Sequence, residues 1–477
     1  MSAYAEIIAI ACALATLAVA AAWVPSVARV FIIAQAAFWS LSYVARPVVL
    51  LVVQPEPHYG DNVPDPRLAE LGYDRGIALV LHHVVFGLWV YAILIVGYAI
   101  WSRRHPVQGL PAMSTNPDFV PALATIYVIG LLGRGASYAT GSIGHAGDVD
   151  SANPILNFVS ILATVAALGL IIFIRPARPR TAALLIGALL AGELMWTVVV
   201  ESKTPILGAA LAVAVRFAIL GWTKAKVVGV LAIAVLGIGG FGWLQSFKTT
   251  EVGKAEAAMV SSAYPPTVRP FLSILRRFDL LEAATDAYYH GTGYWLAPDE
   301  VFRHATLSLI PTQLLGTAKF QSGTAWANDI RGASVDMTRV QVSLAEGNVN
   351  EGYVIGGYTG IVVSVGFTFV LLLAWATALY SRYFPMVVLA LALTGASSLF
   401  ERGILGSMEA LGKFLQAAVL ATLIYLAVKE YRRCAKPTAS DSLQVARNGR
   451  PPPQPIARGV LGQPLVVIGK RGSGPWD

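Results

Sequence analysis

Long apolar runs recur along the whole chain, and they limit its possible folds more than any other feature does. A helix that crosses a bilayer needs about 20 mainly apolar residues. Runs of this kind lie near residues 4–24, 28–53, 76–101, 119–134, 154–174, 181–200, 204–222, 226–246, 353–380, 385–400 and 411–429. Outer-membrane barrels would instead show short alternating segments. The sequence therefore predicts an all-α integral membrane protein with about 11 transmembrane helices.

Composition excludes the soluble classes of protein. Of the 477 residues, 56% are hydrophobic and 13% are charged, whereas average soluble domains carry about 25% charged residues. The net charge is +8, but residues 429–477 hold nine Lys or Arg against three Asp or Glu. The basic excess therefore lies in the tail and does not indicate a nucleic-acid partner. Two cysteines, Cys12 and Cys434, are too few for a disulfide framework or a Cys-rich metal site.

Charge in the short loops predicts the orientation and the division of the chain. Lys and Arg are concentrated in the short loops that lie on the same side as the C-terminal tail. An excess of Lys and Arg is typical of cytoplasmic loops. We expect the N-terminus outside and the C-terminus in the cytoplasm. The first run carries Glu6 and no basic region before it, which favours a retained helix over a signal peptide. The predicted segments are 1–246 with helices 1–8, an extracytoplasmic loop 247–352, 353–429 with helices 9–11, and a disordered basic tail 430–477.

The predicted loop 247–352 is far longer than ordinary connections, and such loops usually carry function. Within Pro270–His290, apolar residues such as Phe271, Leu275 and Leu281 recur at helical spacing. We expect a folded cap in which one or two amphipathic helices lie on the membrane surface.

Ionisable residues gather near the predicted outer face, where their cost points toward function. Arginine suits a lipid-linked diphosphate because its planar guanidinium binds phosphate oxygens in pairs and stays charged. Arg402, which follows Glu401 in a short turn, is the strongest candidate, although any arginine of the loop also suits nonspecific contact with lipid headgroups. Arg46 and Arg216 also fit ordinary snorkelling to the interface.

Other patterns are weaker. His82 and His83 are adjacent and so project about 100° apart on a helix, which favours a buried hydrogen-bonded pair over a shared metal. Asp148 and Asp150 have the spacing of a metal–nucleotide motif but fall on the outer side. The glycines at 352, 356 and 357 open a membrane helix and favour close packing.

A set of motifs in residues 200–415 resembles the Wzy-type oligosaccharide repeat-unit polymerases, which include O-antigen and exopolysaccharide polymerases. In order, the motifs are Glu201-Ser202-Lys203-Thr204-Pro205, Arg277-Phe278-Asp279, Leu309-Ile310-Pro311, Lys319, Ser343-Leu344-Ala345-Glu346-Gly347-Asn348-Val349-Asn350-Glu351-Gly352, Gly356-Gly357-Tyr358-Thr359-Gly360 and Glu401-Arg402-Gly403.

The resemblance implies a membrane glycosyltransferase of the GT-C-like class in the bacterial inner membrane, which acts without metal or cofactor. Its donor and acceptor would be oligosaccharide repeat units linked to a polyprenyl diphosphate, and a flippase and a chain-length regulator would be its partners. Positive charge would stabilise the diphosphate leaving group, and a carboxylate would accept a proton from the attacking hydroxyl. The expected diphosphate-binding residues are Arg402, Arg277, Lys319 and Lys203; the expected base is Glu346 or Glu351; and the expected glycan-binding residues are Asn350, Tyr294 and Trp295.

Two alternatives stay open from the sequence. An O-antigen-ligase-like transferase would use the same donor with a different acceptor. A lipid-linked oligosaccharide flippase or other transporter would place charges near the membrane midplane and commonly carries internal repeats. Neither feature is evident in the sequence.

Overall fold

A computed structural model describes residues 2–57, 63–105, 109–143, 153–200, 202, 204–233, 264–276, 278–293, 295–317, 319–337, 343–396 and 399–434. Within these ranges the secondary structure is entirely helical, with no strand. The chain divides into two units, Met1–Lys429 and Glu430–Asp477. The site described below belongs to the first unit, and in the second unit only the end of one helix is described.

Eight helices of the described residues are long and apolar enough to cross a membrane, so the chain is a multi-pass membrane protein of the helical class. They are α1 (Ala3–Trp23), the continuous α2–η1–α3 (Ala28–Ser40, Leu41–Ala45 and Arg46–Val53), α5 (Tyr73–Arg104), α6 (Phe119–Ala139), α7 (Pro154–Phe173), α8 (Pro179–Val199), α17 (Asn348–Leu379) and α19 (Ile404–Cys434).

The remaining predicted spans are shorter or only partly described. Helices α9 (Thr204–Leu220) and α18 (Phe384–Thr394) are apolar but have fewer than 18 residues. Residues 224–233 are helical, while the rest of the run 226–246 lies outside the described residues, as do the Asp148–Asp150 motif and the tail beyond Cys434. The total of about 11 spans therefore stays a prediction.

Local sequence explains where these helices begin. Pro154 and Pro179 occupy the first helical positions of α7 and α8, where a missing N–H costs nothing. Asn153 accepts hydrogen bonds from the backbone N–H groups of Ile155 and Leu156, which caps α7. At the other end of α7, Arg216 donates to the carbonyls of Ile171, Ile172 and Ile174. Arg216 is therefore buried and caps the end of α7, which agrees with the expected structural role.

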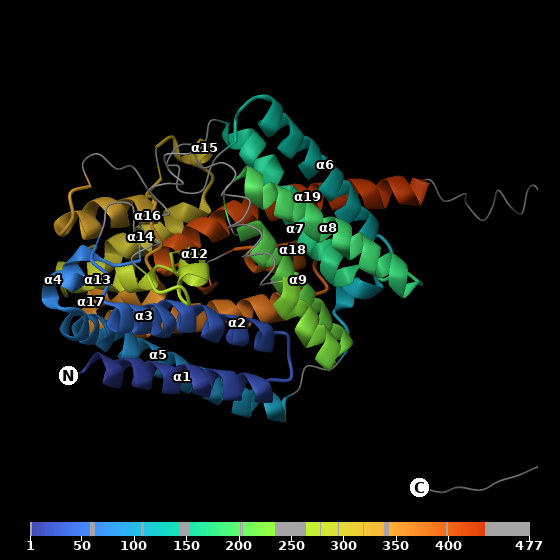
Figure 1. The fold of residues 1–477 in the computed structure, drawn as a ribbon. Helices are drawn as coiled ribbons and strands as arrows, with labels where there is room; N and C mark the ends of the chain where they lie inside the picture. The colour runs from blue at the N-terminus through green and yellow to red at the C-terminus, as the bar shows by residue number, and fades with distance from the viewer. Residues whose placement is uncertain are drawn as a thin grey trace, which may run out of the picture. The chain divides into compact units, whose positions relative to one another are not determined.

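Two groups of helices pack side by side (Figure 1). In the first, α5 contacts α1 and α17, and α1 contacts α2. In the second, α7 contacts α6, α8, α9 and α18. Contacts between α17 and α18 join the two groups. Gly130 of α6 allows a close approach to α7, since a Cβ at this position would collide with the backbone of Ala163. This tight packing fixes α7, which forms one wall of the site.

Helix α17 is broken near its start. Gly356 and Gly357 have non-helical backbone angles, and Gly357 has a φ of 57° that favours glycine. The break brings Gly352 against Gly360, where a Cβ on either residue would meet the other's backbone. The expectation of close packing is confirmed for Gly352, whereas a Cβ on Gly356 would meet no atom within 4 Å and one on Gly357 only Thr292 at 3.9 Å. The short segment before the break carries Asn350 and Glu351 into the interior of the bundle.

The described part of the loop forms short helices. They are η3 (Arg269–Phe271), α12 (Leu272–Leu275), α13 (Leu280–His290), α14 (Pro298–Leu309), α15 (Thr312–Leu315), α16 (Ser322–Ala325), η4 (Trp326–Ile330) and η5 (Arg331–Ala333). Between Pro270 and His290 the chain forms η3, α12 and α13, with helix interrupted between Leu275 and Leu280. The position of these helices on the membrane surface stays a prediction. Helix α13 contacts both α5 and α17, so its apolar side chains pack against protein.

Candidate functional site

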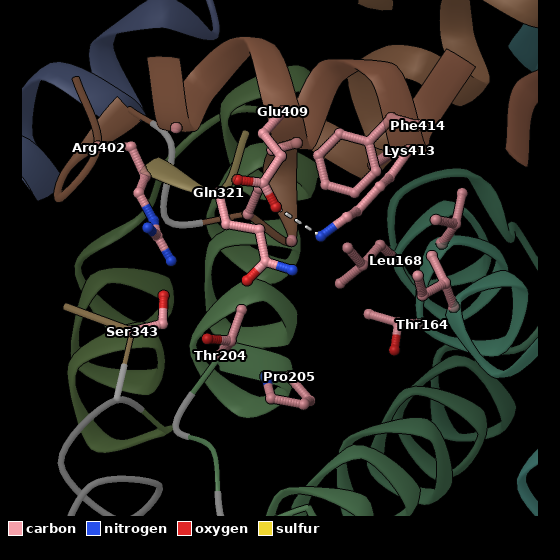
Figure 2. Close-up of a pocket in the computed structure, with 17 residues that line it drawn as sticks. Thr164, Leu168, Thr204, Pro205, Gln321, Ser343, Arg402, Glu409, Lys413 and Phe414 are labelled. Carbon is pink, nitrogen blue, oxygen red and sulfur yellow. Dashed lines mark hydrogen bonds and ion pairs between the residues drawn. The ribbon is translucent and has the colours of Figure 1, made fainter. Parts of the chain in front are cut away.

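A cavity of about 450 Å³ lies among α7, α9, α18 and α19 (Figure 2). One wall is apolar and includes Ile161, Val165 and Leu168 of α7 and Phe414 of α19. The polar lining combines charged and neutral side chains: Thr164, Thr204, Gln321, Ser343, Arg402, Glu409 and Lys413. An amphiphilic lining of this kind suits a ligand that has both a charged and an apolar part.

Arg402 projects toward the loop side of this cavity, near Ser343 (Figure 2). Its Nη1 donates to the carbonyl of Leu344 and to Oε1 of Glu346, each over 3.4 Å. The Arg402 side chain is 29% exposed, whereas Glu346 is fully buried. Burial opposes the positive charge of Arg402, but Glu346, Glu409 and Glu401 raise its pKa. The guanidinium is therefore held in place and charged while part of it faces the cavity.

Glu346 pairs with Arg402 but is not among the residues that line the cavity. Among the described residues, its Oε2 has no hydrogen-bond partner. A Cβ on Gly406 would lie 3.3 Å from this oxygen and 2.9 Å from Cδ of Arg402. The glycine at 406, which itself lines the cavity, thus leaves room for the buried carboxylate of Glu346 beside the arginine.

Glu351 is fully buried at the start of α19. Its carboxylate accepts hydrogen bonds from the backbone N–H groups of Ile404 and Leu405. These are the N–H groups that have no partner within a helix, and they favour negative charge. Glu351 therefore caps α19 from another segment, and it fixes the helix that carries Glu409 and Lys413.

Asn350 is also fully buried and joins three elements. Its Oδ1 is 3.2 Å from Nε2 of His83, and its Nδ2 donates to the hydroxyl of Tyr43 and the carbonyl of Leu280. His83 stacks on Tyr353 with ring centroids 4.4 Å apart. His82, in contrast, has a side chain that is 51% exposed and lies 3.3 Å from Glu6. The expectation of a buried histidine pair is thus correct for His83 and wrong for His82.

Lys319 lies near the cavity but does not line it. Its Nζ donates to the carbonyl of Ser308 over 2.9 Å, and α19 touches this carbonyl at Gly412, where a Cβ would collide with it. Burial lowers the pKa of Lys319, as does the nearby charge of Lys413, while Glu409 opposes both. Among the described residues, Arg402, Lys413 and Lys319 therefore bring positive charge to this region.

Trp295 belongs to an aromatic cluster of the loop. Its indole N–H donates to Asp329, and its ring packs edge-on against Trp326 at 5.8 Å. It is not among the residues that line the cavity. Arg277, Lys203 and Tyr294, which were also expected in the site, lie outside the described residues.

Sequence reasoning missed several cavity residues. Glu409 and Lys413 form an ion pair of 2.9 Å one turn apart on α19, and the spacing of 406, 409 and 413 would have placed them on one helix face. It also missed that Arg134 and Glu193 pair over 2.9 Å and that both contact the cavity residue Thr164. This pairing joins α6, α7 and α8, and nothing in the separate sequence positions reveals it.

Comparisons with known proteins give no relative for this chain. Neither protein-family models, curated proteins nor solved structures match it. Across the described ranges, no three His, Cys, Asp or Glu side chains are grouped as a metal site would require.

Proposed function

We propose that the protein is a polysaccharide polymerase that joins oligosaccharide repeat units carried on polyprenyl diphosphate. The reaction transfers the growing glycan from one lipid carrier to a sugar hydroxyl of a second lipid-linked unit. In this proposal the protein lies in a bacterial inner membrane, with the cavity toward the extracytoplasmic side, the N-terminus outside and the C-terminus in the cytoplasm. The order of motifs that resembles the Wzy-type polymerases motivates the choice.

The observation that carries the proposal is the position of Arg402, which lines the cavity and pairs with the buried carboxylate of Glu346. Anchoring matters because a preorganised positive group stabilises developing charge without having to reorient during the reaction. The same cavity holds Lys413, and Lys319 lies close to it. A leaving diphosphate carries enough negative charge to engage several cations.

The apolar wall supports a lipid carrier. Helices α7, α9 and α18 supply apolar side chains to the cavity, and α7 is itself long and apolar enough to cross the membrane. A polyprenyl chain could extend along such helices while its diphosphate lies beside Arg402. A volume of about 450 Å³ admits the diphosphate and adjoining sugar atoms. The remainder of each glycan would extend out of the cavity toward the loop.

Lys203 and Arg277 remain proposed diphosphate contacts from the resemblance. Asn350, Tyr294 and Trp295 remain proposed glycan contacts. Within the described residues, the side chain of Asn350 is hydrogen-bonded to His83, Tyr43 and the carbonyl of Leu280.

The test is reconstitution with lipid-linked single units extracted from source cells that lack this protein. Purified protein in lipid nanodiscs should convert these units into a ladder of longer lipid-linked chains, with release of one polyprenyl diphosphate for each bond formed. Absence of a ladder, together with normal polysaccharide in the deletion cells, would refute the proposal. Transfer of glycan only to a separately supplied acceptor would identify a ligase, and movement of units across sealed vesicles without bond formation would identify a transporter.

A further inference from the structure

The polar side of the cavity includes a carboxylate that the family resemblance does not point to. Among the described residues that line it, Glu409 supplies the carboxylate. Its side chain is 23% exposed, and it pairs over 2.9 Å with Lys413, whose side chain is 60% exposed. Figure 2 shows Glu409 and Gln321 between Arg402 and Lys413. Glu409 can thus reach a ligand without rearrangement of the helices.

The two carboxylates expected from the sequence have other contacts. Glu351 is fully buried and holds two backbone N–H groups of α19. Glu346 is fully buried and pairs with Arg402 over 3.4 Å. A general base must come within hydrogen-bond distance of the proton it accepts. Neither carboxylate lines the cavity, whereas Glu409 does.

We propose that Glu409 is the general base that takes the proton from the attacking sugar hydroxyl; this inference rests on the proposed polymerase function. The hydroxyl oxygen forms a bond to the anomeric carbon as the bond from that carbon to the diphosphate oxygen breaks. The proton passes to the Glu409 carboxylate, and the bonding electron pair leaves with the diphosphate. No further reactant is needed.

Lys413 completes this arrangement. Its ammonium pairs with Glu409 over 2.9 Å. When a diphosphate enters, Lys413 has a stronger anionic partner, and Glu409 becomes available to the acceptor hydroxyl. The charged groups around Glu409 are Lys413 from α19, Arg402 from the segment before α19 and Lys319 from the loop.

The experiment breaks the same ion pair from either side. The Glu409→Gln variant should retain binding of geranylgeranyl diphosphate in detergent within about threefold of wild type, and it should lose about 100-fold or more of kcat with the extracted lipid-linked units. The Lys413→Met variant should instead weaken diphosphate binding and raise KM. The kcat of wild type should rise with pH as its base deprotonates, and the residual kcat of Glu409→Gln should lack that rise.

Glu430→Gln is the matched control, because Glu430 also pairs with a basic residue on α19 but is 66% exposed and is not a cavity residue. It should behave as wild type. If wild type builds chains and Glu409→Gln keeps a third or more of its rate, the base assignment fails while the polymerase function stands. If Glu409→Gln and Lys413→Met lose kcat equally and both keep the rise of kcat with pH, the ion pair has a structural role and Glu409 is not the base. If wild type builds no chains, both the base assignment and the polymerase function fail.

Discussion

Two regions of the molecule hold arginines against buried carboxylates, and they do so in opposite ways. Around Asp286, which is fully buried, Arg67 and Arg331 donate over 2.6 and 2.9 Å and Trp326 donates over 3.2 Å. Arg67 also pairs with Asp65, and Arg331 with Glu282. At the cavity, Arg402 reaches Glu346 over 3.4 Å and is partly exposed.

The difference separates an arginine that holds the fold from one that is available to a ligand. The Asp286 cluster (Asp65, Arg67, Glu282, Asp286, Trp326 and Arg331) ties α4 (Pro66–Leu71) to the loop elements α13, η4 and η5. Its opposite charges raise the pKa of Arg67 and Arg331 against the effect of burial. A buried charge is tolerated when it is paired and fully hydrogen-bonded. Arg402 has looser contacts and an open side, which is what a phosphate-binding group requires.

The largest expected effect lies in the Asp286 cluster. Replacement of Asp286 by Ala would leave two buried arginines without their shared partner, which costs about 3–5 kcal/mol. We expect little folded protein in the membrane fraction, and a strongly lowered unfolding temperature for what can be purified. An Asp286→Ala protein with wild-type thermal stability would show that the cluster does not hold the loop in place.

Next is Arg402 itself. If Arg402 stabilises the leaving diphosphate, the Arg402→Ala variant should lose polymerisation by about 100- to 1000-fold per folded molecule. Its unfolding temperature should fall less than that of Asp286→Ala, because one buried carboxylate, Glu346, loses a partner instead of two arginines. Arg402→Lys should recover part of the rate, since the charge returns without the bidentate fork. Long-chain product from the Ala variant in the reconstituted assay would remove Arg402 from the site.

Glu351 distinguishes a capping role from a catalytic one. Glu351→Gln keeps the shape but leaves one N–H of α19 without an acceptor, and loss of a helix cap costs about 0.5–2 kcal/mol. We expect a lower unfolding temperature with kcat per folded molecule changed less than about threefold. A collapse of kcat at unchanged stability would return the base assignment to Glu351.

A smaller effect is expected at Lys319. Its ammonium donates to the carbonyl of Ser308 and lies beside the cavity, so Lys319→Met should weaken binding of geranylgeranyl diphosphate by about three- to fivefold, the size of a partly exposed charge interaction. Binding of geranylgeraniol, which lacks the charge, serves as the control and should not change. Equal affinity of wild type and variant for the diphosphate would exclude Lys319 from the site.

The smallest expected effect is that of a chelator. If cations of the protein alone offset the charge of the diphosphate, EDTA should leave the rate of chain growth unchanged within about 20%, as expected when no metal acts as the charge-stabilising group. Strong inhibition, reversed by added Mg²⁺ or Mn²⁺, would instead give Asp148 and Asp150 a metal-binding role.

The sequence by itself determined the membrane class, most helix positions and the choice of Arg402 as a residue to examine. Apolar runs of bilayer length require helices whatever the tertiary structure, because an unpaired backbone group in lipid is too costly. Apolar spacing in the loop likewise indicated helix where α13 lies, but it did not reveal that α13, with buried residues such as Leu281 and Ala284, packs against α5 and α17.

Only the tertiary structure decided which charged groups meet. Glu346 and Arg402 are 56 positions apart, and Arg134 and Glu193 are 59 apart. No local pattern encodes these pairings, because they depend on how helices cross. Likewise, no local pattern shows that Glu351, in the segment before the break at Gly356–Gly357, accepts hydrogen bonds from the start of α19. The carboxylate that lines the cavity among the described residues is that of Glu409. Hydrophobicity along the chain sets which segments are helices, whereas packing between distant segments sets the chemistry of the site.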